Sequence, residues 1–184
     1  VEQPLPGGAT LRVEASTPTE ALAVLAEFLD GVPDSLDLAP WLRRAQESRA
    51  RDDPEQAVVA LESALSRTTS PSEQAALLVT QGNAYYEAKQ FEQAAAAWLQ
   101  ALEVAEAITS PPERAEAMSV AHNNYAILLA AQGRPGEAEG HYREALRLRP
   151  DYPEAHNNYA LLLADRGRPE EAEGHYQEAL RRRP

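Results

Sequence analysis

The chain has 184 residues and a formal net charge of −12, because 29 acidic side chains outnumber 17 basic ones. Proteins that bind nucleic-acid phosphates usually present a basic face, so this excess of acid disfavours a nucleic-acid partner. The chain has no cysteine, which excludes disulfides and thiolate metal sites.

No apolar run approaches the roughly 18 to 20 residues that a membrane-spanning helix needs, and no leader peptide is recognisable. We therefore predict a cytoplasmic protein that does not insert into membranes. The sequence is rich in Ala, Glu, Leu and Arg, which favours helices. Lys89 is the only lysine, and this preference for Arg together with abundant Ala is typical of a GC-rich bacterial genome.

The N-terminal part of the chain differs in pattern from the rest. Residues 1–16 contain Pro, Gly and acidic side chains, and we expect them to be extended or disordered. Residues 17–37 should form a short helix and a linker. The helix, over residues 18–29, is amphipathic. We expect its apolar side to cap the array that follows; alternatively, it belongs to a separate upstream domain.

The C-terminal part contains a sequence repeat, since residues 121–150 recur 34 residues later as 155–184. A period of that length is typical of a stacked array of one helical unit. Such an array presents an extended surface rather than a deep catalytic pocket. The two copies differ only at Ile127/Leu161, Ala131/Asp165, Gln132/Arg166, Gly136/Glu170, Arg143/Gln177 and Leu148/Arg182.

Each copy is predicted to contain two helices. In the last copy the first helix covers about residues 154–166 and ends before Gly167, a residue that allows the chain to turn at a helix end. The second helix begins at Pro169, where the missing N–H costs nothing. Alanines and aromatic residues recur at helical spacing within both helices and predict their packing faces.

Polar residues mark the beginnings of earlier helices. Ser70 with Glu73, and Ser110 with Glu113, predict two capping boxes, in which Ser accepts from a backbone N–H and Glu reaches back. Asp53 followed by Pro predicts a third helix start.

These residues resemble the tetratricopeptide repeat (TPR) family, whose pattern combines small and aromatic residues. The last copy matches at His156, Tyr159, Ala160, Leu163, Ala172, Tyr176, Ala179 and Pro184, and the preceding copy at the residues 34 positions earlier. An earlier unit matches at Leu78, Gln81, Gly82, Tyr85, Ala94, Trp98 and Ala101, with a second helix expected to run to about Ile108. A degenerate first unit matches at Trp41, Ala45, Ala57, Leu61 and Ala64. The resemblance implies an all-α fold, a right-handed superhelix of helix-turn-helix repeats at 38–70, 71–110, 111–150 and 151–184.

In this family the first helices of the repeats line a concave groove. The resemblance implies a partner-binding surface at Gln46, Arg49, Val79, Asn83, Tyr86, Glu87, Asn123, Ile127, Asn157 and Leu161. Asparagine amides can form hydrogen bonds with a peptide backbone whatever the charge of the peptide's side chains. We expect Asn124 and Asn158 instead to brace their own units, whereas for Asn83, Asn123 and Asn157 bracing and partner binding remain alternatives.

Some TPR modules hold the C-terminal carboxylate of a chaperone in a clamp of Lys, Asn and Arg. Asn83 and Asn124 match that clamp, but Val79, Glu154 and Asn158 stand where its cations belong. An acidic peptide tail would then lack counter-ions, so we predict that this chain does not bind one.

The histidines do not indicate a metal site. His122 and His156 occupy a position usually filled by a bulky packing residue, and we expect them to pack in the same way. His141 and His175 are expected to be polar surface. The sequence shows no Ser or Cys nucleophile with a credible His and Asp partner, no glycine-rich phosphate loop and no metalloprotease motif. We therefore predict no enzymatic activity, no metal and no cofactor.

These observations predict a non-catalytic scaffold that binds a peptide or helix of a partner protein in the concave groove. A second interpretation is a structural module that self-associates end to end through its uncapped C-terminal repeat. A third is the regulatory or sensor arm of a larger bacterial enzyme or signalling protein.

Overall fold

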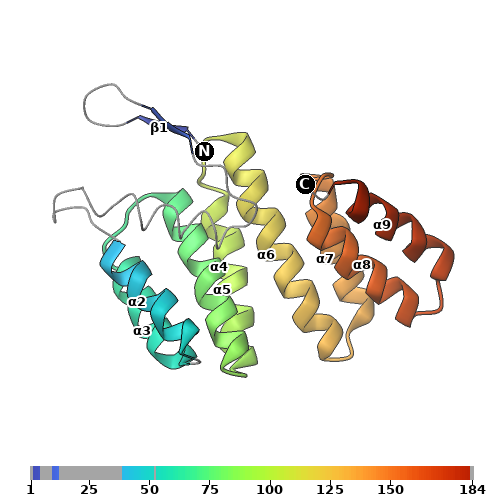
Figure 1. Ribbon diagram of the computed structural model, residues 1–184, viewed down its shortest axis with the longest axis horizontal. Coiled ribbons are helices and arrows are strands. Elements are labelled where there is room, and N and C mark those ends of the chain that lie inside the picture. The colour runs from blue at the N-terminus through green and yellow to red at the C-terminus, as the bar shows by residue number, and fades with distance from the viewer. Residues whose placement is uncertain (1, 5–9, 13–38, 52, 183–184) are drawn as a thin grey trace. The chain divides into compact units, whose positions relative to one another are not determined.

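The computed structural model describes residues 2–4, 10–12, 39–51 and 53–182 (Figure 1). The chain divides into two compact units, Val1–Thr69 and Ser70–Pro184. The short helix and linker predicted for residues 17–37 lie outside the described residues.

The N-terminal unit contains a small β-ribbon and a helical hairpin. Strand β1 (Glu2–Pro4) pairs antiparallel with β2 (Thr10–Arg12). Helix α2 (Ala39–Ala50) packs against α3 (Pro54–Leu65), which begins as predicted, with Asp53 Oδ1 accepting from the Gln56 backbone N–H at 3.1 Å. The hairpin buries Leu42, Ala45, Ala57, Val58, Ala60, Leu61 and Ala64.

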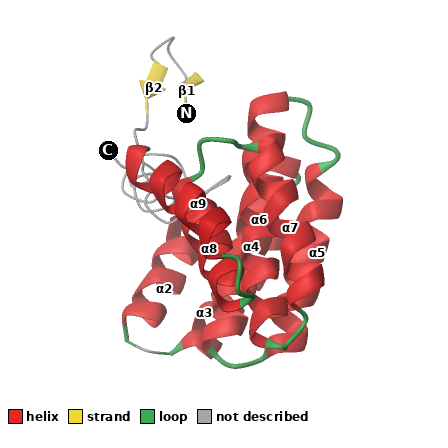
Figure 2. Cartoon of the chain, turned by 90° about the vertical axis from the view of Figure 1, so that its right-hand side faces the viewer, coloured by secondary structure: helices red, strands yellow, loops and turns green. Residues whose placement is uncertain are grey.

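The C-terminal unit consists of three consecutive helical hairpins (Figure 2). Their helices are α4 (Pro71–Glu87) with α5 (Phe91–Ala105), α6 (Pro111–Ala131) with α7 (Pro135–Leu148), and α8 (Pro153–Asp165) with α9 (Pro169–Arg181). The second helix of each hairpin packs on the first helix of the next. This confirms the predicted all-α fold of stacked helix-turn-helix units.

The first helices of these hairpins also pack against one another, α4 on α6 and α6 on α8. Contacts between the successive second helices, α5, α7 and α9, are sparser. Helices that approach more closely lie on the inner side of a curved stack, so α4, α6 and α8 form what we call the inner surface of this unit.

Proline and glycine set several boundaries where they were predicted. Helices α4, α6, α7, α8 and α9 each have Pro in their first turn. Gly133 and Gly167 adopt the left-handed conformation after α6 and α8, with φ of 73° and 72°. Lys89 takes the equivalent place after α4 with φ of 60°, a conformation that a residue with a Cβ disfavours.

The capping hydrogen bonds predicted for Ser70 and Ser110 are wrong. Ser70 and Ser110 stand at the N-caps of α4 and α6, but neither side chain makes a capping hydrogen bond. Glu113 instead accepts a hydrogen bond from Ser72 Oγ at 2.6 Å, which joins the beginnings of the two helices. Helix α5 is also shorter than predicted, because Ile108 lies in the turn after it and is buried with Ala75 and Ala105.

The core depends on small residues where helices approach closely. The alanines predicted at these sites are buried: Ala94, Ala126, Ala138, Ala145, Ala160, Ala172 and Ala179. At Gly82 a methyl group would lie within 2.6 Å of Trp98 Cδ1, so only glycine allows the indole to pack there. The Trp98 Nε1–H donates to the Val79 carbonyl at 3.2 Å, which satisfies the buried polar group.

Candidate protein-interaction surface

A chain of asparagine side chains crosses the inner surface from α8 to α4. Asn158 Nδ2 donates to Asn123 Oδ1 at 3.1 Å, and Asn123 Nδ2 donates to Asn124 Oδ1 at 3.1 Å. Asn124 Nδ2 donates to Asn83 Oδ1 at 2.8 Å, which also accepts from Trp98 Nε1 at 3.2 Å. The two middle amides, Asn123 and Asn124, each donate through the nitrogen to one neighbour and accept through the oxygen from the other, so the chain fixes the spacing of the three first helices.

These bonds show what the asparagines do in the free protein. Asn124 and Asn158 brace the structure, but each donates to the preceding hairpin rather than within its own unit. Asn83 and Asn123 take part in the same bracing. Asn123 is 3 % exposed and Val79 is 4 % exposed, so neither side chain offers appreciable area to a partner.

The remaining groove residues differ in exposure. Glu87 and Leu161 are exposed, whereas Tyr86, Ile127 and Asn157 are half-buried. The Tyr86 ring lies 5.5 Å from Phe91 and 6.0 Å from Trp98, so it has structural contacts as well. Gln46 is half-buried and belongs with Arg49 to α2 in the N-terminal unit; the Arg49 side chain lies outside the described residues.

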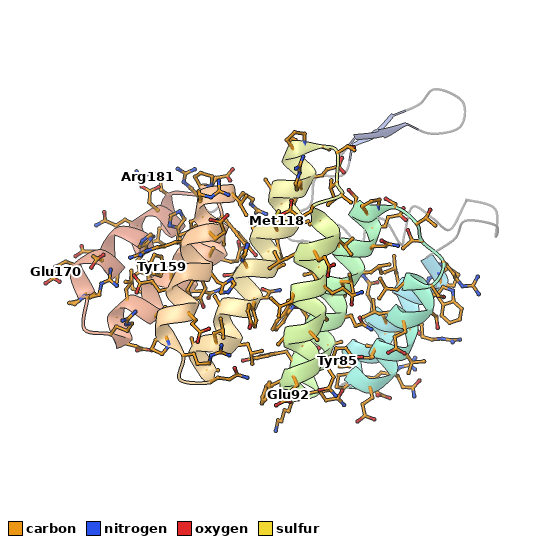
Figure 3. All side chains as sticks on the ribbon, turned by 180° about the vertical axis from the view of Figure 1, so that it is seen from behind. Tyr85, Glu92, Met118, Tyr159, Glu170 and Arg181 are labelled. Carbon is orange, nitrogen blue, oxygen red and sulfur yellow. The ribbon has the colours of Figure 1, made fainter. Side chains whose placement is uncertain are left out.

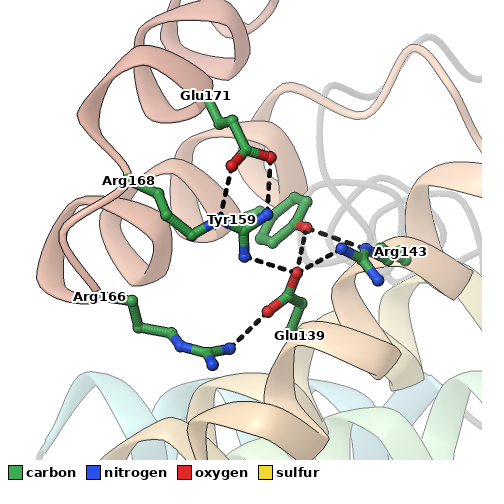
Figure 4. Close-up of polar contacts among 6 residues, drawn as sticks. All are labelled: Glu139, Arg143, Tyr159, Arg166, Arg168 and Glu171. Atoms are coloured by element: carbon green, nitrogen blue, oxygen red, sulfur yellow. Dashed lines mark hydrogen bonds and ion pairs between the residues drawn. The ribbon is translucent and has the colours of Figure 1, made fainter.

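An ionic cluster that we did not predict surrounds Glu139 of α7 (Figure 4). Glu139 is 7 % exposed, and its carboxylate accepts hydrogen bonds from Arg143, from Arg168 at 2.8 Å, from Arg166 at 2.5 Å and from the Tyr159 hydroxyl at 3.1 Å. Burial alone would raise the pKa of Glu139, but the hydrogen bonds from Arg168 and Tyr159 and the charge of Arg143 hold it below its usual value. The cluster therefore joins α7 to α8 and to the turn before α9.

The histidines form two pairs, one inside each of the last two hairpins. His122 Nδ1 lies 2.8 Å from His141 Nδ1, and His156 Nδ1 lies 2.9 Å from His175 Nδ1. The expectation that His141 and His175 are simply polar surface is therefore wrong, because each faces a partner across its hairpin. His156 packs as expected, with an exposed fraction of 8 %.

Each pair is a hydrogen bond that requires at least one neutral ring. Burial and the nearby His141 lower the pKa of His122 to about 4, and burial also lowers the pKa values of His141 and His175. The rings of His122, His141 and His175 are therefore neutral near pH 7. Among the described residues, no group of three or more His, Cys, Asp or Glu side chains could hold a metal ion.

Comparison with protein families identifies the repeat. Two sequence profiles, both described as tetratricopeptide repeat, match residues 73–151 and 124–184. This chain belongs to the tetratricopeptide repeat family. TPR repeats generally mediate protein–protein interactions, and their scaffolds are typically non-catalytic. No curated protein sequence matches the chain.

Solved structures with the TPR fold resemble the chain at low sequence identity. BtubC (BKLC) from P. vanneervenii has a TM-score of 0.70 and 17 % identity, with coverage of 90 % of this chain and 72 % of that one. MamA has a TM-score of 0.60 and 15 % identity, with coverage of 90 % and 88 %. The second TPR of Spaghetti (RPAP3), bound to the HSP90 peptide SRMEEVD, has a TM-score of 0.52 and 18 % identity, with coverage of 61 % and 90 %.

Two further observations bear on the surface of this TPR protein. None of its described helices is both long and apolar enough to cross a membrane. Large exposed apolar side chains in the C-terminal unit are Phe91, Leu99, Leu161 and Leu180. Leu161 lies on the inner helix α8, Phe91 and Leu99 lie on α5, and Leu180 lies on α9 at the end of the stack.

Proposed function

We propose that this protein is a non-catalytic cytoplasmic scaffold whose inner surface binds a peptide or helix of a partner protein. The observation that carries the proposal is the row of first helices, α4, α6 and α8, joined side by side by the asparagine chain. A surface held in place before binding loses little conformational entropy when a partner arrives.

The side chains along this row indicate the chemistry of the partner. At the helix positions that line the TPR groove, the described part of the C-terminal unit carries the acids Glu87, Glu154 and Asp165 and no basic residue. The acids are exposed, and the same positions carry the apolar side chains of Leu161, which is exposed, and Ile127, which is half-buried. Charge complementarity favours a partner segment with apolar and basic side chains.

The same positions argue against an acidic tail such as the SRMEEVD peptide that the Spaghetti TPR binds. Val79 is buried, Glu154 is acidic, and Asn158 already donates to Asn123. The inner surface therefore has no cation at these three positions to pair with glutamate or a terminal carboxylate.

A random peptide library displayed on phage and selected against the full chain tests the proposal. We expect enriched peptides to combine Arg or Lys with Leu, Ile or aromatic residues. Synthetic copies of these peptides should bind the Glu87→Lys variant about tenfold more weakly than the wild type, because the substitution places two like charges together.

The matched control is Glu92→Lys, which reverses an exposed acid of the same hairpin on the second helix, α5. It should leave the affinity within about twofold of the wild type. Enrichment of acidic peptides, or equal weakening by the two variants, would place binding elsewhere and contradict the proposal.

A further inference from the structure

The hairpin α4/α5 holds a buried indole between its two helices. Trp98 belongs to α5, which packs against α4; Figure 3 labels Glu92 on α5 and Tyr85 on α4. Trp98 is 2 % exposed, and a Cβ added at Gly82 would lie within 2.6 Å of its Cδ1. The ring fits because Gly82 has no side chain, so packing in the core fixes the place of the indole N–H.

The indole N–H decides which way the side chain of Asn83 is turned. Trp98 Nε1 lies 3.2 Å from Asn83 Oδ1 and 3.2 Å from the Val79 carbonyl oxygen. An indole nitrogen donates a hydrogen bond and cannot accept one. The Asn83 atom that faces it must therefore be the oxygen. The oxygen and nitrogen of an amide occupy nearly the same space, so packing alone does not make this choice.

The direction chosen at Asn83 extends along the whole asparagine chain. Because Asn83 Oδ1 accepts, Asn124 offers its nitrogen, and the Asn124 oxygen accepts from Asn123. Asn123 in turn keeps its oxygen for Asn158. If all four amides were turned over, the same three hydrogen bonds would form in the opposite direction. The Asn83 nitrogen would then face the indole N–H, and two donors would meet.

The other two hairpins of the unit carry a different residue at this place. At the position of Trp98 in the TPR pattern stand Tyr142 in α6/α7 and Tyr176 in α8/α9. A tyrosine hydroxyl both donates and accepts, so it fits an amide in either orientation. Of the three equivalent aromatic residues, Trp98 alone imposes a direction.

This direction determines what Asn83 offers at the inner surface. Asn83 is half-buried on α4, and no group in the described part of the chain accepts from its nitrogen. Among the enclosed side-chain nitrogen and oxygen atoms of the described residues, only Arg149 Nη1 lacks a hydrogen-bond partner, so the Asn83 nitrogen is open to solvent. The exposed acid Glu87 lies one turn further along α4. A backbone carbonyl of a partner fits an N–H donor beside an acid, whereas a carboxylate does not.

We propose that Trp98 is a positioning residue of the inner surface: from within the core it sets the direction of the asparagine chain and so makes Asn83 a hydrogen-bond donor toward the partner. The effect on a partner rests on the function proposed above, but the direction of the chain does not depend on a partner. Without the indole N–H, both directions have the same hydrogen bonds, and Asn83 presents its oxygen in part of the molecules.

Two isosteric substitutions at the ends of one hydrogen bond test the direction. In Asn83→Asp the carboxylate still accepts from Asn124 and Trp98, so the equilibrium constant for folding should stay within about threefold of the wild type. In Asn124→Asp an oxygen replaces the donor and faces Asn83 Oδ1, so the constant should fall about tenfold or more. Urea unfolding followed by circular dichroism measures both. Each variant adds one negative charge, so charge alone does not separate them.

Removing the indole N–H should abolish that difference. In the Trp98→Phe background Asn83 can turn its nitrogen toward the new carboxylate, so Asn124→Asp should cost no more than Asn83→Asp. If Trp98 acted through packing alone, the tenfold difference would persist in this background, which would overturn the proposal. Equal losses in the presence of Trp98 would also overturn it. If the Trp98→Phe protein does not fold, Trp98→Tyr serves the same comparison, because the other two hairpins carry tyrosine there.

The peptides enriched in the phage selection test the consequence for binding. They should bind the double variant Trp98→Phe with Asn124→Asp at least about fivefold more weakly than the wild type, because Asn83 then turns its oxygen outward. The added acid by itself favours basic peptides, so the loss cannot come from charge. Trp98→Phe alone is the control and should weaken binding only about twofold, because part of the molecules keep the original direction.

Unchanged affinity of the double variant, or equal weakening by the control, would overturn the proposal. The two proposals fail separately. If the selection yields no peptide, the proposed function fails, while the unfolding experiment still decides whether Trp98 directs the asparagine chain.

Discussion

The hairpins α6/α7 and α8/α9 have nearly the same sequence in two different surroundings. Tyr142 is 2 % exposed, whereas its counterpart Tyr176 is half-buried. Glu139 lies among three guanidinium groups, whereas Glu173 is exposed. Because these residues are identical, the difference arises from what covers each hairpin, which is α8 in the first case. Burial in a repeat array is thus a property of the neighbour as much as of the residue.

The few positions at which the two repeats differ are also informative. Arg143 and Arg166 both bind Glu139, and their counterparts are Gln177 and Gln132. Two of the six differences therefore build one ionic cluster at the joint between the hairpins. The duplicated residues supply the packing and also Glu139, Tyr159 and Arg168 of the cluster, to which the diverged residues add Arg143 and Arg166.

The largest difference between the two hairpins is expected from their central tyrosines. Tyr142→Ala should lower the free energy of unfolding by about 3 kcal/mol, because it removes a fully buried ring and leaves a cavity. Tyr176→Ala should cost only about 1 kcal/mol, because the residue is only partly buried against the core. Urea unfolding followed by circular dichroism measures both free energies, and equal losses would mean that Tyr176 is as well covered in solution as Tyr142.

The carboxylates provide the second test of the comparison. Glu139→Gln should cost about 2 kcal/mol, because charge-assisted hydrogen bonds from several arginines are lost while their charges remain. The matched variant Glu173→Gln should change stability by less than about 0.5 kcal/mol, as for most exposed positions. The same urea unfolding experiment applies. If Glu139→Gln lowered the free energy of unfolding no more than Glu173→Gln does, the cluster would stabilise the fold no more than an exposed ion pair.

Local signals in the sequence were sufficient for the repeat fold. Gly167 and Pro169 predicted the turn between α8 and α9, since left-handed φ and a missing N–H are properties of single residues. The small residues at Gly82 and Ala160 likewise follow from close helix approach. These features depend on neighbours within one or two helical turns. The 34-residue repeat makes them easier to recognise, because the same local signals occur twice.

Contacts between repeats were not predictable in the same way. Glu113 appeared as a capping residue, but its partner is Ser72, 41 positions away. Arg166 and Glu139 are 27 positions apart, a separation that carries no helical pattern, so the sequence did not indicate their pairing. The pairing of His122 with His141 was not indicated either, because the recurrence of their spacing in His156 and His175 follows from the duplication itself.

The histidine pairs predict a moderate loss of stability in acid. The folded pKa values of His122, His141 and His175 are lowered, that of His122 to about 4 from 6.5, so the unfolded chain binds more protons between these values. Stability is therefore retained above about pH 6.5 and falls as the pH decreases toward 4. Glu144 opposes and Arg147 reinforces the lowering at His122. After allowance for solvent screening, we expect the His122–His141 pair to lower the free energy of unfolding by about 1 kcal/mol between pH 7 and pH 5.

The comparison that isolates this effect is the double variant His122→Leu with His141→Leu. It should be less sensitive than the wild type to pH between 7 and 5 in urea unfolding, since the carboxylates that titrate nearby are unchanged. A double variant with the pH dependence of the wild type would show that other groups cause the acid sensitivity.

The smallest effect is expected at the turn of the hairpin α4/α5, which differs from the turns of the other two hairpins. Lys89 has φ of 60°, where Gly133 and Gly167 have φ of 73° and 72°. Lys89→Gly should therefore raise the free energy of unfolding, by about 0.5 kcal/mol, because relief of left-handed strain exceeds the added entropy of the unfolded chain. Gly167→Ala should instead lower the free energy of unfolding, by about 1 kcal/mol. A Cβ added at Gly167 would have no atom within 4 Å, so this loss measures backbone strain alone. Thermal unfolding of both variants measures the pair, and a destabilised Lys89→Gly protein would mean that the Lys89 side chain contributes more than its strain costs.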